Sequence, residues 1–275
     1  MLKKLLRYDF KAVLRYWWIA ALTSFGLALL GSACIGLLDF EKDLPELVDV
    51  TAGLGIFTVM LGFTAFLVLS SILIFIRFYR NLFTDEGYLT FTLPVKHSQI
   101  LNSKLIMSSI MFILSSIVVF FDVIIMLCLP FLEDIIASRF WEYIIQFFRD
   151  AKAETVLYLN VYFIETILIF IALSIFSVLL LFCCITFASV ITKKAKVITA
   201  IGIYYGVSSV LSFAMQIFFI FGFDSLIEWM SAIPEEQAQF AAAQLFFGIL
   251  VFILIFCMLL YTFEHWLIDR KLNLS

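Results

Sequence analysis

The chain has 275 residues, of which 64% are hydrophobic and 14% are charged, and its formal net charge is -3. Soluble domains are about half apolar and about a quarter charged, so this composition excludes an ordinary soluble fold and indicates a polytopic helical membrane protein. The small net charge and the lack of a basic stripe with interleaved aromatic residues argue against nucleic-acid binding.

Residues 1–16 are predicted to form an amphipathic helix that lies on the membrane surface. An apolar face opposite a basic face suits the headgroup region of an anionic bilayer. The apolar residues are Leu2, Leu6, Phe10, Val13, Leu14 and Trp17, and the basic residues are Lys3, Lys4, Arg7, Lys11 and Arg15. The alternative is that this segment is the ordinary basic flank of the first membrane span.

Apolar runs long enough to cross a bilayer recur along the rest of the chain. They predict six spans, at residues 17–38, 52–76, 104–130, 157–191, 198–222 and 241–263. Tyr16, Trp17 and Trp18 are expected to anchor the first span at the membrane interface. The fourth run exceeds the about 20 residues that a bilayer needs, so it must tilt, protrude or break. We therefore expect an all-α fold, with residues 1–275 as one transmembrane domain.

The distribution of Lys and Arg predicts the orientation of these spans. The segments assigned to the inside carry 14 of these residues, whereas the outer segments carry only 4, namely Lys42, Arg139, Arg149 and Lys152. Because connections rich in Lys and Arg stay in the cytoplasm, both termini are expected to be cytoplasmic.

Residues 131–156 and 223–240 are expected to be outer segments, and the first is expected to contain a helix. In the first, Ile136, Phe140, Ile144 and Phe147 share one helical face, while Glu142, Gln146 and Arg149 lie elsewhere. This spacing predicts a short helix that is half-sunk in the outer leaflet or that caps the bundle.

The longest polar interruption on the inner side is the segment 77–104, which we call the cytoplasmic loop. Arg77 to Asn81 are expected to continue the second span, and Gly87 ends that helix. Pro94 prevents the helix from continuing, and Ser98 is a suitable N-cap for the third span.

The cytoplasmic loop carries apolar side chains that water does not favour, so something is expected to cover them. They indicate a docking surface for a soluble partner, although they could instead fold back onto the headgroups or the bundle. The candidate partner-binding residues are Arg80, Phe83, Asp85, Glu86, Tyr88, Phe91, Leu93 and Pro94.

The loop sequence FYRNLFTDEGYLTFTLPV at residues 78–95 resembles that of small permease subunits of ATP-binding cassette (ABC) exporters of the second type, from Gram-positive bacteria. The N-terminal basic helix, the six spans and the terminal segment 271–274 (KLNL) add to the resemblance. It implies a multi-pass protein of the bacterial cytoplasmic membrane, with its loop seated in a cleft of a separate cytoplasmic ABC ATPase.

The same resemblance implies two permease subunits per transporter, as a homodimer or a heterodimer. ATP and Mg²⁺ would be bound by the ATPase, so this chain is expected to bind no cofactor. It also has no G-x-x-x-x-G-K-[ST] phosphate loop, no G-x-S-x-G and no H-E-x-x-H. We therefore expect no catalytic residues.

No histidine lies near the five cysteines, all in apolar runs, so neither a metal site nor a disulfide framework is expected.

Three polar residues within the spans are candidates for a substrate pathway: Asp122, Glu165 and Gln216. Such groups are costly in a bilayer and usually face a cavity or a partner. They could line an outward vestibule that contacts cationic groups of a substrate, or each could be hydrogen-bonded to a neighbouring helix. Gly202 and Gly206 permit close helix packing, either within the chain or at a dimer seam.

These features favour an exporter subunit that moves a hydrophobic or amphipathic substrate outward. The main alternative is a membrane sensor or scaffold that recruits a cytoplasmic partner without transport. A membrane enzyme acting on lipid would need clustered catalytic residues at one interface, and the sequence contains no such cluster.

Overall fold

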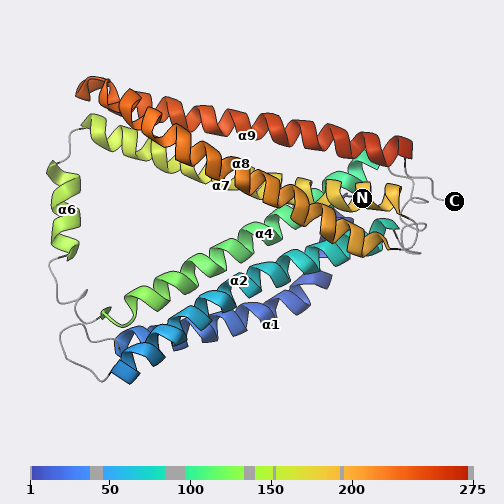
Figure 1. Cartoon of the computed structure of the whole chain (residues 1–275), viewed down its shortest axis with the longest axis horizontal. Coiled ribbons are helices and arrows are strands. Elements are labelled where there is room, and N and C mark those ends of the chain that lie inside the picture. Colours follow the sequence, from blue (N-terminus) through green and yellow to red (C-terminus); the bar gives the residue numbers. More distant parts are fainter. Residues whose placement is uncertain are drawn as a thin grey trace. The chain divides into compact units, whose positions relative to one another are not determined.

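A computed structural model describes residues 2–37, 46–83, 97–132, 140–150, 153–192 and 195–271. Every regular element in these ranges is a helix (Figure 1). The helices are α1 (Leu2–Leu37), α2 (Glu46–Phe83), α4 (His97–Cys128), α6 (Phe140–Asp150), α7 (Ala153–Ile191), α8 (Lys196–Ser231) and α9 (Glu235–Lys271). The predicted all-α class is confirmed, and α6 is the short helix predicted within residues 131–156.

Six of the described helices are long and apolar enough to cross a membrane. The candidate spans are Leu6–Leu37, Val50–Phe83, Ser98–Cys128, Thr155–Ile191, Lys196–Gly222 and Gln237–Ile268. They match the six predicted spans in order and indicate a multi-pass membrane protein. Helix α7 is unbroken over 39 residues, or about 58 Å. The structure therefore excludes a break in this helix, and tilting or protrusion remains as the way in which it fits a bilayer.

Helix α1 is continuous from Leu2 to Leu37, so the structure does not support a separate interfacial helix at residues 1–16. These residues contain no Gly or Pro that would end the helix, and the backbone hydrogen bonds continue past them. Asp9, Val13 and Trp17 are buried. Trp17 is therefore not the interface anchor that the sequence predicted, whereas its neighbours Tyr16 and Trp18 are exposed.

The chain divides into two compact units. Unit 1 comprises Met1–Phe78 and Ile106–Asp150, and unit 2 comprises Tyr79–Leu105 and Ala151–Ser275. Helices α2 and α4 each contribute residues to both units.

Unit 1 is built around contacts that α1 makes with α2 and α4. The Trp17 ring lies 6.2 Å from the ring of Phe66 on α2, and its Nε1 donates a 2.7 Å hydrogen bond to Ser115 Oγ on α4. Two turns later, the Ser24 hydroxyl donates to Oδ2 of Asp122, also at 2.7 Å. Both hydrogen bonds join residues 98 positions apart, so α1 and α4 run parallel in constant register.

Gly31 lies where α1 packs closely against α2 and α4. A Cβ at this position would be 2.8 Å from Sδ of Met126 and 3.0 Å from Cγ1 of Val59. Met126 and Val59 belong to a buried cluster with Ala28 and Phe63. Only hydrogen fits at Gly31 without a shift of this core.

We predict that Gly31→Val lowers the free energy of unfolding by about 1–3 kcal/mol, because the larger side chain overpacks this cluster. Gly26→Val is the matched control, because a Cβ at Gly26 meets nothing within 4 Å. Thermal unfolding of both purified variants in detergent, followed by circular dichroism, measures the difference. Equal destabilisation by the two substitutions would show that the Gly31 contact is not tight.

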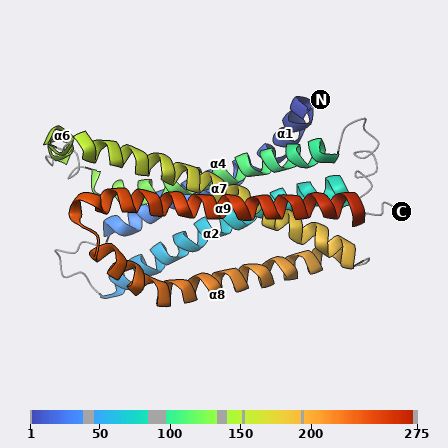
Figure 2. The ribbon, with the colours of Figure 1, turned by 90° about the horizontal axis from the view of Figure 1, so that it is seen from above.

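Unit 2 has α7 at its centre, packed against both α8 and α9. The Tyr162 hydroxyl donates a 2.6 Å hydrogen bond to the carbonyl of Gln239, and the Cys183 thiol donates to the carbonyl of Leu260 at 3.5 Å. Each contact joins residues 77 positions apart, so α7 and α9 run parallel (Figure 2). The two contacts are separated by about 32 Å along α7, close to the thickness of a bilayer core.

Candidate functional site

Most of the predicted partner-binding residues, namely Asp85, Glu86, Tyr88, Phe91, Leu93 and Pro94, lie outside the described residues. Helix α2 extends to Phe83, which confirms that Arg77 to Asn81 continue the second span. On its last turns Arg80 is exposed, and the rings of Tyr79 and Phe83 stack at 5.9 Å. Helix α4 begins at His97, so Ser98 lies within the first turn and is not the predicted N-cap.

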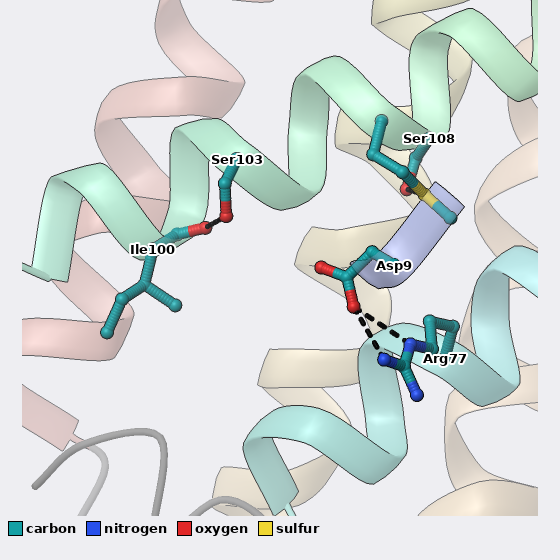
Figure 3. A network of polar contacts seen from close by, with 6 residues as sticks. Asp9, Arg77, Ile100, Ser103 and Ser108 are labelled. Carbon is teal, nitrogen blue, oxygen red and sulfur yellow. Dashed lines mark hydrogen bonds and ion pairs between the residues drawn. The ribbon is translucent and has the colours of Figure 1, made fainter. Parts of the chain in front are cut away.

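The upstream base of the loop at residues 77–104 is joined to α1 by an ion pair in unit 1 (Figure 3). Nε and Nη2 of Arg77 lie 2.9 Å and 2.7 Å from Oδ1 of Asp9. The Asp9 side chain is 3% exposed and the Arg77 side chain is 28% exposed. A carboxylate buried to this degree requires a cationic or hydrogen-bonding partner. This contact therefore fixes the start of the loop relative to α1.

Sequence reasoning missed Asp9. The available signal was a single carboxylate among five basic residues in the first 16 positions, four residues before the buried Val13. That spacing places Asp9 on the buried face of α1, but the sequence alone does not identify Arg77 as its partner.

We predict that Arg77→Ala destabilises the protein more than Asp9→Ala does. Removing the half-exposed arginine leaves a buried carboxylate without its guanidinium, at a cost of about 2–3 kcal/mol, whereas Arg77 can turn toward solvent when Asp9 is removed. Arg7→Ala, at an exposed position on the same helix, is the control. The measurement is the unfolding temperature of the three variants in detergent. A lower unfolding temperature for Asp9→Ala than for Arg77→Ala would contradict the prediction.

The downstream base of the loop is joined to α9 within unit 2. The hydroxyl of Tyr261 donates a 2.8 Å hydrogen bond to Oδ1 of Asn102, which lies in the second turn of α4. Both helices that flank the loop are therefore held by side-chain hydrogen bonds close to the point where the loop begins and ends.

Unit 2 also contains a fully buried carboxyl group that sequence reasoning missed. Glu264 on α9 accepts a 2.6 Å hydrogen bond at Oε1 from the Thr186 hydroxyl on α7. Its Oε2 has no hydrogen-bond partner in the part of the chain that the structure describes. The predicted sixth span ends at residue 263, so the hydrophobic pattern alone assigns Glu264 to the region outside the membrane. The structure extends that candidate span to Ile268.

The structure places the three candidate pathway residues differently. Asp122 is buried in unit 1, where it accepts the hydrogen bond from Ser24. Glu165 is half-buried on α7 and Gln216 is exposed on α8, and both belong to unit 2. A vestibule lined by all three residues stays a prediction.

Gly202 and Gly206 lie on an exposed face of α8, and a Cβ at either glycine would meet nothing within 4 Å. No described residue therefore packs tightly against them. Contact with a second subunit is the hypothesis that we retain for this pair.

Within the described ranges, no group of three or more His, Cys, Asp or Glu side chains is arranged to hold a metal ion, and the five cysteines are free. Comparison of the chain with protein-family models, with curated proteins and with solved structures finds no match.

Proposed function

We propose that this chain is the membrane-spanning subunit of an ATP-driven ABC exporter in the bacterial cytoplasmic membrane. Both termini lie in the cytoplasm, and the cytoplasmic loop at 77–104 docks into a separate ATPase. The excess of Lys and Arg in the inner segments and the loop sequence at 78–95 support this assignment. The chain supplies no nucleotide site of its own.

The anchoring of the loop at both ends is the observation that carries the proposal. Arg77 joins its upstream base to α1, and Asn102 joins its downstream base to α9. A segment transmits force only when its ends are fixed to rigid elements. Here the two ends are helices of 38 and 32 residues that continue without interruption from the loop across the membrane. A displacement of the loop would therefore move both helices.

The proposed cycle is mechanical. ATP binding draws two ATPase subunits together, and their movement displaces the loops of two permease subunits. Each permease then changes between two arrangements of its helices and opens a path outward for a hydrophobic or amphipathic substrate. Only a difference in the affinity of the ATPase for the two arrangements can drive this change, so the loop must dock more tightly in one arrangement than in the other.

Co-expression with the ABC ATPase that we expect in a neighbouring reading frame tests the proposal. A tag on this chain should recover the ATPase in stoichiometric amount, and the complex, but not the chain alone, should hydrolyse Mg-ATP. In proteoliposomes, hydrolysis should move substrate outward. A complex that forms but moves nothing supports the scaffold alternative, and transport without nucleotide or without the ATPase contradicts the proposal.

A further inference from the structure

One face of α7 combines aromatic rings with a carboxylate inside a candidate membrane span. Tyr158, Tyr162 and Glu165 lie at positions i, i+4 and i+7, which share one side of a helix. The rings of Tyr158 and Tyr162 stack at 6.4 Å, and the ring of Phe246 on α9 lies 6.0 Å from Tyr162. Three aromatic rings and one carboxylate are thus gathered on the α7–α9 pair of unit 2.

One of the two oxygens of the Glu165 carboxylate stands without a hydrogen bond in the part of the chain that the structure describes. This oxygen, Oε2, is buried. Tyr162 is close enough to interact with this carboxylate electrostatically, but its one hydroxyl proton is already donated to the carbonyl of Gln239 at 2.6 Å. The neighbouring tyrosine therefore cannot satisfy Glu165, and a group from outside the described chain is needed.

Glu165 also lies within a helix segment that is long and apolar enough to cross a membrane. It lies ten residues inside the candidate span that begins at Thr155, or about 15 Å along the helix. A carboxylate at that depth is costly unless it faces a cation, a hydrogen-bond donor or water. Glu165, Tyr158 and Tyr162 are only half-buried and Phe246 is exposed, so a ligand can approach the cluster from its exposed side, although Oε2 itself is buried.

We propose that Glu165, together with the rings of Tyr158, Tyr162 and Phe246, binds an amphipathic organic cation. The carboxylate neutralises the positive charge, and the electron-rich faces of the rings attract the cation and cover its apolar substituents. A small metal ion would need several oxygen, nitrogen or sulfur ligands, which this cluster does not offer. An anion would be repelled by Glu165. This inference rests on the proposed function and identifies the class of substrate.

Binding of tetraphenylphosphonium to the full chain in zwitterionic lipid nanodiscs tests the site without ATPase or nucleotide. The wild-type protein should bind this cation saturably and should not bind tetraphenylborate, an anion of nearly the same shape. Glu165→Gln should weaken binding by at least about 10-fold, because it removes the charge and keeps the size. Tyr162→Leu should weaken it by about 3- to 30-fold, because it removes a ring that faces the cation.

Three variants serve as controls. Tyr162→Phe keeps the ring and should bind within about 3-fold of wild type. Glu165→Asp keeps the charge and should recover part of the binding that Glu165→Gln loses, which separates loss of charge from misfolding. Glu142→Gln removes an exposed carboxylate on α6 and should leave binding unchanged. The cation should also raise the unfolding temperature of the wild type but not that of Glu165→Gln.

Equal binding by wild type and Glu165→Gln, equal binding of the cation and the anion, or uptake explained by partition into lipid alone would each overturn the inference. These outcomes are separable from failure of the proposed function. A chain that recruits an ATPase but does not bind the cation refutes only the site. A chain that binds the cation but recruits no ATPase refutes only the exporter assignment.

Discussion

Replacing both Tyr88 and Phe91 with aspartate is expected to reduce recovery of the ATPase with this chain by at least about 10-fold. Aromatic side chains that become buried in a partner commonly contribute about 2 kcal/mol or more to binding. Burial of an unpaired carboxylate in their place adds a desolvation cost. The measurement is co-purification through a tag on the permease, quantified at matched membrane expression.

The matched control is the pair Tyr88→Phe with Phe91→Tyr, which keeps an aromatic ring at both positions and should retain most of the complex. The unfolding temperature of the aspartate variant should equal that of wild type, because the expected partner contact is absent from the isolated chain. Undiminished recovery of the ATPase by the aspartate variant would show that the loop is not the docking element.

Thr186→Val is expected to lower the free energy of unfolding by about 2–4 kcal/mol. Valine has nearly the shape of threonine, so packing between α7 and α9 is kept and only the hydroxyl is lost. That hydroxyl donates the 2.6 Å hydrogen bond to Glu264 Oε1, and Oε2 has no partner among the described residues. The substitution therefore removes the hydroxyl donor of a fully buried carboxyl group and leaves it only the weak thiol donor of Cys183.

A double-mutant cycle identifies the cause of this loss. Glu264→Met combined with Thr186→Val replaces the polar pair by apolar groups and should recover most of the stability that Thr186→Val loses. Thr58→Val is the control, since the Thr58 hydroxyl is exposed and donates only to the carbonyl of Leu54 on its own helix. Strictly additive effects of the two substitutions would mean that Thr186 and Glu264 do not interact.

The spans could be predicted because the signal for a membrane helix is local. Each is a run of about 20 apolar residues, and the structure has an apolar helix at each predicted place. The ends were less accurate, because helices continue past the hydrophobic run when no Gly or Pro stops them. This is why α1 includes residues 2–16 and why the sixth candidate span includes Glu264.

Contacts between helices could not be predicted in the same way. Asp9 and Arg77 are 68 positions apart, and nothing in either local sequence specifies the other. The residues around Trp17 are a second example. An apolar helical face can pack against lipid or against protein, so the sequence pattern does not show that Trp17 is buried. The sequence identified Glu165 and Asp122 as polar groups in the membrane, but only the structure distinguishes the hydrogen-bonded Asp122 from the unsatisfied Glu165.

Cysteine accessibility at the loop tests the central claim, that energy enters this protein from a cytoplasmic ATPase through residues 77–104. The experiment places one cysteine at Gly87, or at Ala232 as an outer control, in a chain whose five native cysteines are replaced. A membrane-impermeant maleimide is then applied to intact cells and to inside-out vesicles. We expect Gly87→Cys to react in the inside-out vesicles and not in intact cells, and we expect bound ATPase to slow the reaction in the vesicles. Ala232→Cys should react in intact cells. Reaction of Gly87→Cys in intact cells would place the loop outside the cell and contradict the account.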